Sequence, residues 1–320
     1  GQLMEILVGD TIYFSATDAS SGHELWAHDT SNASTWRVAD INSGSVSSSP
    51  GNYMSILVGD TLYFNANDGS SGKELWAHDT SNASTWRVTD INSGSASSNP
   101  GAYMSILVGD TLYFSAEDGS SGRELWAHDT SNASTWRVTD IRSGGSSSSP
   151  GLYMEILVGD TLYFDANDGS SGKELWAHDT SNASTWRVTD INSGTASSNP
   201  GAYMSILVGD TLYFNADDGS SGQELWAHDT SNASTWRVAD VYSGTASSNP
   251  GAYMSILVGD TLYFSADDGS SGYELWAHQP GEITSLSSGS GSGSGTTTNG
   301  NGTTWQVADI NSGADSSYPG

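Results

Sequence analysis

The sequence contains no cysteine, which excludes disulfides, thiolate metal sites and a cysteine nucleophile. No apolar run comes near the ~20 residues that a membrane-spanning helix needs, so we expect no membrane span. Lysine and arginine number only 9 against 37 aspartates and glutamates, which gives a net charge of −28. Because nucleic-acid phosphates are bound largely through lysine and arginine, this balance argues against a nucleic-acid partner. It suits divalent cations, a salty medium or simple colloidal solubility.

What the sequence does contain is a repeat. The segment Asp-Gly-Ser-Ser-Gly-Lys-Glu-Leu-Trp-Ala-His-Asp at 68–79 recurs in close copies, each 50 residues from the next, and Glu-Leu-Trp-Ala-His is unchanged in all six. A fixed period of this size indicates one supersecondary unit used repeatedly. The repeats cover about 1–50, 51–100, 101–150, 151–200, 201–250 and 251–320.

Each repeat is predicted to form four strands, which in the second copy cover 54–58, 61–66, 73–78 and 85–90. Gly59-Asp60 between the first two is a hairpin signal, because these residues tolerate the positive φ of a two-residue turn. Aromatic and β-branched residues fill the strands. Apolar residues occupy both alternating faces, so we expect each sheet to be covered on both sides. The segment 92–102 is rich in serine and glycine and is predicted to cross to the next repeat.

These features predict an all-β protein: a six-bladed β-propeller with four antiparallel strands per blade, forming a single domain over 1–320. A linear β-solenoid is the alternative, but its coils are usually shorter and its ends need capping. We therefore expect a monomeric closed ring.

The motif Glu74-Leu75-Trp76-Ala77-His78-Asp79 resembles the ELWxxDGT repeat family, and the resemblance covers nearly the whole chain once per blade. It implies a propeller-like fold and adds little about function. Thr80 stands where that family has glycine, so the following turn is expected to differ. The near-identity of the repeats indicates recent duplication or deliberate symmetrisation of an engineered protein.

The last repeat contains an insert at 279–303, whose centre, Gly289–Gly295, alternates glycine and serine like a flexible linker. Two interpretations stay open. The insert is a tolerated loop at a hairpin tip, or it joins former termini after circular permutation.

Recurrent aspartates are the candidate ligand residues, since two loops of each blade are expected to share one face. They are Asp18, Asp68, Asp118, Asp168, Asp218 and Asp268 in one loop and Asp40, Asp90, Asp140, Asp190, Asp240 and Asp309 in the other. Their oxygens suit calcium or sugar hydroxyls. Aspartate and glycine also make ordinary turns, and the spacing is not that of an EF-hand. We lean towards turns, and no cofactor is firmly implied, with calcium as the alternative.

Like charges gather on this predicted face, and we expect no matching lysines there. The position of Lys73 varies among the repeats (His23, Arg123, Lys173, Gln223, Tyr273), which suggests exposure to solvent. The glutamate of the repeated motif is expected to accept hydrogen bonds from backbone donors of a neighbouring loop. The arginine of the fourth strand, Arg87 in the second copy, is expected to pair with that glutamate or to shield a sheet edge.

Invariant tryptophans in the third strand are predicted to be structural and buried between blades, with Trp76→Ala costing about 3–5 kcal/mol. They are Trp26, Trp76, Trp126, Trp176, Trp226 and Trp276. The adjacent histidine of each copy is also expected to be structural, because a sixfold repeat supplies no unique catalytic cleft.

The sequence therefore favours a non-enzymatic scaffold or binding propeller without catalytic residues. The alternatives are a multivalent lectin, a calcium-binding extracellular propeller, and a glycosidase, which needs two carboxylates in one cleft. A glycan or a protein is the expected type of ligand. Repeated Asn-Ala-Ser sequons, such as Asn82-Ala83-Ser84, fit an extracellular or cell-surface location if the protein is natural rather than recombinant.

Overall fold

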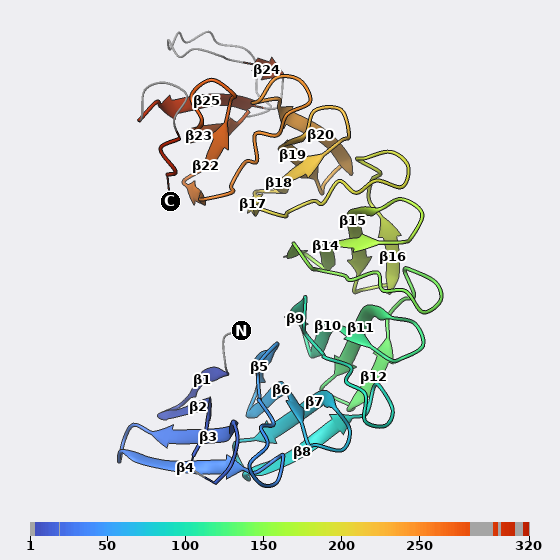
Figure 1. Cartoon of the computed structure of the whole chain (residues 1–320), viewed down its shortest axis with the longest axis vertical. Helices are drawn as coiled ribbons and strands as arrows, with labels where there is room; N and C mark the ends of the chain where they lie inside the picture. The colour runs from blue at the N-terminus through green and yellow to red at the C-terminus, as the bar shows by residue number, and fades with distance from the viewer. Residues whose placement is uncertain (1–3, 19, 282–296, 300–301, 311–315, 320) are drawn as a thin grey trace. The chain divides into compact units, whose positions relative to one another are not determined.

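The computed structural model describes residues 4–18, 20–281, 297–299, 302–310 and 316–319, and their regular structure is entirely β (Figure 1). Each repeat forms its own antiparallel sheet. The first five sheets have four strands in chain order, and the last has five strands, of which the final two are in reversed order. The predicted all-β class and four-stranded sheets are thus confirmed. No helix in the described part of the chain is long and apolar enough to cross a membrane.

Contacts divide the chain into two compact units, Gly1–Leu152 and Tyr153–Gly320. The first unit holds β1 (Glu5–Val8), β2 (Thr11–Ala16), β3 (Glu24–Asp29), β4 (Ser34–Ala39), β5 (Ser55–Val58), β6 (Thr61–Asn67), β7 (Lys73–Asp79), β8 (Ser84–Thr89), β9 (Ser105–Val108), β10 (Thr111–Glu117), β11 (Arg123–Asp129) and β12 (Ser134–Arg137). The second holds β13 (Glu155–Val158), β14 (Thr161–Asn167), β15 (Lys173–Asp179), β16 (Ser184–Arg187), β17 (Ser205–Val208), β18 (Thr211–Asp217), β19 (Gln223–Asp229), β20 (Ser234–Ala239), β21 (Ser255–Val258), β22 (Thr261–Asp267), β23 (Tyr273–Pro280), β24 (Thr297–Asn299) and β25 (Gly302–Ala308).

The strand boundaries in the second repeat agree with the predicted ones to within one residue. Val58 pairs with Thr61, so the hairpin between β5 and β6 has two residues. Gly59 has φ +58°, which is the left-handed backbone that such a turn requires. The register between β7 and β8 shifts between Leu75 and Trp76, which face Thr89 and Arg87, so Val88 is the extra residue of a bulge on β8.

Within each unit, the apolar core lies between consecutive sheets. In the first unit, Leu112 and Phe114 of β10 pack with Met54, Tyr63 and Leu75 of the preceding repeat, and all five side chains are buried. Equivalent clusters join the first repeat to the second, the fourth to the fifth, and the fifth to the sixth. The double-sided apolar pattern therefore reflects a sheet that is covered on both faces by its neighbours.

The segment that links two repeats is fixed to the sheet that follows it. The Gly101 N–H donates to the Ser115 carbonyl at 2.9 Å, and the Glu117 N–H donates to the Ser98 carbonyl at 3.0 Å. Gly101 has φ +76°, and a Cβ added there would lie 2.5 Å from the Met54 Cβ. Only glycine therefore fits at this crossing without displacing the core methionine.

The insert of the last repeat is not wholly a loop. Its first residues extend β23 to Pro280, and its last residues enter β25, which pairs with both β23 and β24. Residues 279–280 and 302–303 of the insert therefore lie in strands. The glycine-serine tract lies outside the described residues.

Candidate functional site

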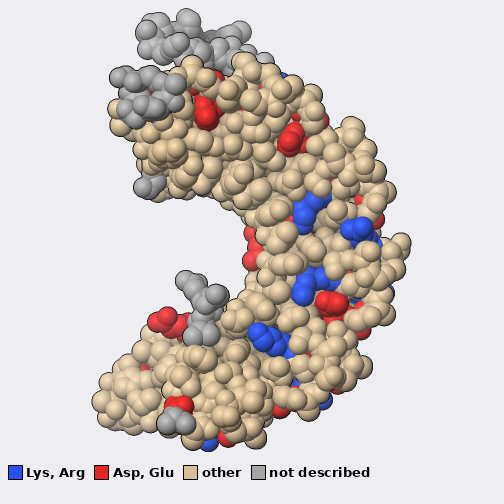
Figure 2. Space-filling model, in the orientation of Figure 1, with Lys and Arg blue, Asp and Glu red and all other residues tan. Residues whose placement is uncertain are grey.

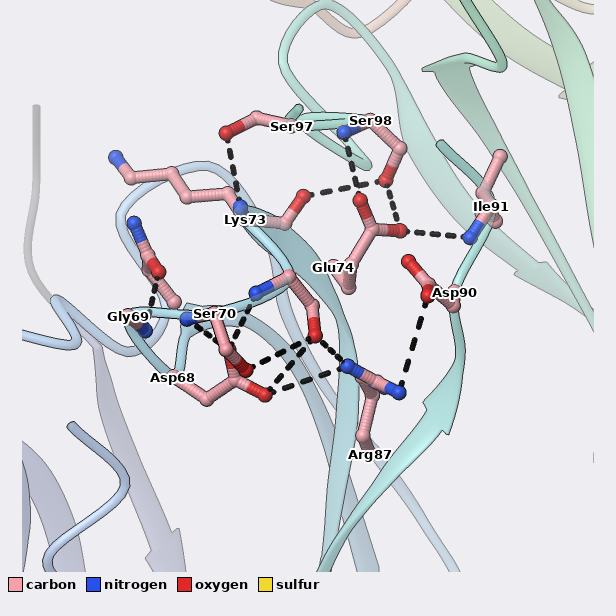
Figure 3. Close-up of polar contacts among 12 residues, drawn as sticks. Asp68, Gly69, Ser70, Lys73, Glu74, Arg87, Asp90, Ile91, Ser97 and Ser98 are labelled. Carbon is pink, nitrogen blue, oxygen red and sulfur yellow. Dashed lines mark hydrogen bonds and ion pairs between the residues drawn. The ribbon is translucent and has the colours of Figure 1, made fainter. Parts of the chain in front are cut away.

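Each aspartate of the first candidate set caps its own turn. Asp68 Oδ1 accepts hydrogen bonds from the N–H groups of Ser70 at 2.8 Å and Ser71 at 2.7 Å, and from the Ser70 hydroxyl at 2.9 Å (Figure 3). Side-chain capping of this kind is a common use of aspartate in loops. The arrangement recurs at Asp18, Asp118, Asp168, Asp218 and Asp268. One carboxylate oxygen of each is therefore already occupied by local donors.

The arginine of the fourth strand joins the two sets of candidate aspartates. Arg87 Nη1 lies 3.3 Å from Asp68 Oδ2, and Arg87 Nη2 lies 3.9 Å from Asp90 Oδ2 (Figure 3). Arg87 also donates to the Ser71 hydroxyl. The same bridge is made by Arg137, Arg187 and Arg237 with the two aspartates of their repeats. The structure thus brings the two predicted loops together, as expected.

Two sequence-based expectations about charge need correction. Arginine, rather than lysine, supplies the matching positive charge on this face, and several basic side chains in Figure 2 lie beside acidic ones. The arginine does not pair with the motif glutamate. The hairpin register between β7 and β8 sets Arg87 opposite Trp76, from where its guanidinium reaches the loop aspartates.

The first and last repeats depart from this arrangement. In the first, Arg37 pairs with Asp40 at 3.5 Å. In the last, Gln306 lies opposite Trp276, in the place that arginine takes in the other repeats. The aspartates of the last repeat therefore have a neutral side chain where the middle repeats have a cation.

Hydrogen bonding controls the ionisation of the capping aspartates. Partial burial of Asp118 raises its pKa, but the backbone and hydroxyl donors of Ser120 and Ser121 outweigh burial and lower the pKa to about 2. The same opposing causes lower the pKa of Asp68. These carboxylates are consequently ionised at any pH where the protein would normally be handled.

The described residues contain no group of three or more aspartate, glutamate or histidine side chains placed to hold a metal ion. In the middle repeats, Asp68 has one oxygen bonded to backbone donors and the other close to Arg87. A calcium ion would have to displace that guanidinium, since calcium needs several oxygen ligands at once. Calcium binding is a hypothesis for the last repeat above all, where Gln306 takes the place of the arginine and no guanidinium would have to be displaced.

Calcium is expected to raise the melting temperature no more than sodium chloride at matched ionic strength. Both salts would only screen the repulsion among carboxylates, whereas a cation bound by the native state alone would stabilise it further. Thermal melts in the two salts check this. A calcium-specific rise that disappears in Asp268→Asn, and persists in Asp68→Asn, would place a metal site in the last repeat and contradict the prediction.

The motif glutamate anchors the crossing segment, as expected. Glu74 is fully buried, and it accepts hydrogen bonds from the N–H of Ile91 at 2.8 Å, the N–H of Ser98 at 2.9 Å and the Ser98 hydroxyl at 2.7 Å (Figure 3). Burial raises its pKa more than these donors lower it. For Glu174 and Glu224 the same balance raises the pKa to about 7.

The third-strand tryptophans are less buried than the sequence suggested. Trp76, Trp126 and Trp226 are only partly buried, although each packs against the core cluster shared with the preceding repeat. Trp276 alone among the six is buried, at 7% exposure. The phenylalanine of the second strand fills the centre of the interface instead, and Phe64, Phe114, Phe164, Phe214 and Phe264 are all fully buried.

The motif histidine is held between two repeats. His78 Nδ1 lies 2.8 Å from the Thr85 hydroxyl oxygen, and its ring centroid lies 5.4 Å from that of Tyr13. Burial lowers the pKa of His78. A neutral, packed imidazole with a hydroxyl partner has a structural role in this position.

Sequence reasoning missed one set of polar residues. The variable residue that begins the third strand does not face solvent everywhere, because Arg123 and Lys173 are only 8% exposed. Lys173 Nζ lies 2.9 Å from Asp165 Oδ2, and Asn215 Nδ2 donates to Gln223 Oε1 at 2.6 Å. Comparison of the repeats contains a signal, since the residue eight places earlier on the second strand is polar in every repeat and also varies.

No protein-family model matches the chain, and no curated protein matches it. Similar solved structures exist. Dipeptidyl peptidase 4 of Porphyromonas gingivalis has a TM-score of 0.57 at 9% identity, covering 87% of this chain and 44% of that one. A structure from an analysis of two prolyl endopeptidases has a TM-score of 0.52 at 13% identity, covering 86% and 41%. A puromycin-hydrolyzing peptidase of Mycobacterium tuberculosis has a TM-score of 0.50 at 11% identity, covering 87% and 42%.

This chain spans less than half the length of those three proteins. The regions that resemble it are propeller domains of larger enzymes. Identities this low show a shared fold and carry no information about activity. The chain is therefore an all-β repeat protein of propeller-like architecture.

Proposed function

We propose that this chain is a non-enzymatic β-propeller that serves as a structural or binding scaffold. The observation that carries the proposal is that the repeated polar side chains make hydrogen bonds, ion pairs or packing contacts within the fold. Asp68 caps a turn, Arg87 bridges two loops, Glu74 anchors the crossing segment and His78 packs between sheets. Residues committed to such bonds in every repeat are poor candidates for a catalytic acid, base or nucleophile.

The same proposal includes closure of the six sheets into one ring. Phe14 and Ile12 of the first repeat are only partly buried, while their equivalents Phe64 and Leu62 are fully buried. Phe14 and Ile12 also line a cavity of about 1000 Å³. In the last repeat, Ile256 and Val258 are exposed by 51% and 58%. These are the two faces that neighbours cover elsewhere, so their mutual burial in a ring would remove both from water.

A multivalent lectin is the second candidate, and one observation favours it. Tyrosines just before the first strand occur in the second to sixth repeats and are exposed by 41–50%. They are Tyr53, Tyr103, Tyr153, Tyr203 and Tyr253. Exposed aromatic rings are suited to stacking on the apolar faces of sugars, with the nearby aspartate or asparagine oxygens as hydrogen-bond acceptors.

A glycan-array screen of the intact chain separates the two candidates. The scaffold proposal expects no glycan to bind above background. Binding that is lost in Tyr203→Ser but kept in Trp136→Ala, an exposed aromatic on a different strand, would replace the scaffold with the lectin. Hydrolysis of any bound glycan would instead support a glycosidase, which requires two carboxylates several Å apart in one cleft.

A further inference from the structure

The second repeat contains two hydrogen-bond donors that face no acceptor. Asn65 is fully buried on β6, and its Oδ1 accepts hydrogen bonds from the N–H groups of Tyr53 at 2.8 Å and Met54 at 3.1 Å. Those bonds fix the amide orientation, and Asn65 Nδ2 is left buried without a hydrogen-bond partner. A buried donor without an acceptor costs about 1–3 kcal/mol.

A lysine, Lys73, begins the strand that pairs with the strand of Asn65. Lys73 Nζ lies 4.6 Å from the centre of the Tyr53 ring, which is the ring whose backbone N–H holds Asn65 Oδ1. In the described part of the chain Lys73 Nζ makes no ion pair with a carboxylate. The aromatic face attracts the ammonium group but leaves its N–H donors unused.

In the second unit, the two side chains of each equivalent pair are hydrogen-bonded to one another. In the fourth repeat, Asp165 Oδ1 accepts the N–H groups of Tyr153 at 2.7 Å and Met154 at 3.0 Å, and its second oxygen meets Lys173 Nζ at 2.9 Å. In the fifth repeat, Asn215 Nδ2 donates to Gln223 Oε1. Only the second repeat combines the lysine of one pair with the asparagine of the other, so two donors meet there.

We propose that Lys73 Nζ and Asn65 Nδ2 form a binding subsite for the carboxylate group of a ligand, beside the Tyr53 ring. One carboxylate oxygen would accept from the ammonium group and the other from the amide. Charge-assisted hydrogen bonds of this type are the stronger ones in proteins. Lys73 is partly exposed, unlike Lys173, whereas Asn65 Nδ2 is buried, so a ligand would reach the ammonium group from solvent and the amide only through a local side-chain movement. A chloride ion carries the same negative charge but, as a single atom, lacks the two oxygens with which a carboxylate would accept from both donors.

Acetate and chloride serve as probes in parallel titrations of the intact, ¹⁵N-labelled chain at equal sodium concentration. The readout is the chemical shift of the Asn65 side-chain amide, identified as the signal that Asn65→Asp removes. We expect acetate to give a saturable shift, with chloride weaker or without effect. No acetate-dependent shift, or saturation by chloride alone, would overturn the proposal.

Three variants exchange pairs that the chain already uses, so each should fold, and thermal melts verify this. Asn65→Asp copies the fourth repeat and Lys73→Gln copies the fifth, and both should weaken acetate binding about tenfold or more. The acetate-dependent stabilisation of the melting temperature measures this in Asn65→Asp. Asp165→Asn copies the second repeat and should add one acetate-responsive amide. Unchanged acetate binding in both Asn65→Asp and Lys73→Gln would refute the site.

Discussion

Replacing Phe114 by alanine is expected to lower the free energy of unfolding by about 3–5 kcal/mol, as large-to-small changes do in a packed core. Phe114 is fully buried and belongs to the cluster formed with Met54, Tyr63 and Leu75 of the preceding repeat. Its removal would leave a cavity between two sheets that neither can readily fill. Denaturant unfolding followed by tryptophan fluorescence and far-ultraviolet circular dichroism measures the loss.

Trp136→Ala is the control within the same repeat, since this ring is 40% exposed and should cost about 1 kcal/mol or less. A loss for Phe114→Ala as small as that of the control would contradict packing between sheets.

The equivalent change in the first repeat tests ring closure. Phe14 stands where Phe114 does, but no preceding repeat covers it in the sequence order. In a closed ring, Phe14→Ala should cost nearly as much as Phe114→Ala, because the last repeat would bury it. A much smaller cost for Phe14→Ala would mean that the ring stays open.

The buried glutamates should make stability depend on pH, and Glu224 is the clearest case. Burial raises its pKa to about 7, although the N–H groups of Val241 and Ser248 and the Ser248 hydroxyl all bond to it. In the unfolded chain a glutamate titrates near 4.5. The folded state therefore binds the proton more tightly, and stability from this group is complete below pH 4.5 and falls as pH rises towards 7.

The network has room for that proton. The Ser248 hydroxyl lies 2.7 Å from Glu224 Oε2 and 3.2 Å from the Gln223 carbonyl. A protonated Glu224 can donate to the serine oxygen while the serine donates to the carbonyl. The hydrogen bond between Glu224 and the Ser248 hydroxyl then reverses its direction, and no hydrogen bond is lost.

Glu224→Gln isolates this effect. The difference in unfolding free energy between variant and wild type should shift by about 3 kcal/mol in favour of glutamine between pH 4.5 and pH 8, at 1.36 kcal/mol per unit of pKa. Comparing the two proteins cancels the opposite trend of the buried histidines. For example, burial lowers the pKa of His228, whose contribution is lost as pH falls below 6.5. A pH-independent difference would show that Glu224 is ionised throughout.

The period of the sequence was enough to predict the sheets. Gly59-Asp60 marks a tight hairpin, the apolar residues on both strand faces require covers on both sides, and the strand boundaries follow from these two features. The role of Glu74 also followed from the sequence, because a buried carboxylate must find donors and the loops between strands carry them. These properties depend on neighbours along the chain, which is why sequence alone can reveal them.

The partners of side chains across strands were decided only by tertiary structure. The register of the hairpin between β7 and β8 sets Arg87 opposite Trp76, within reach of Asp68 and Asp90. The same limit applies to Asn65 and Lys73, which lie on neighbouring strands and meet only through the hairpin register. Residue type decides whether each side chain is a donor or an acceptor, but which side chains face one another is set by packing in three dimensions.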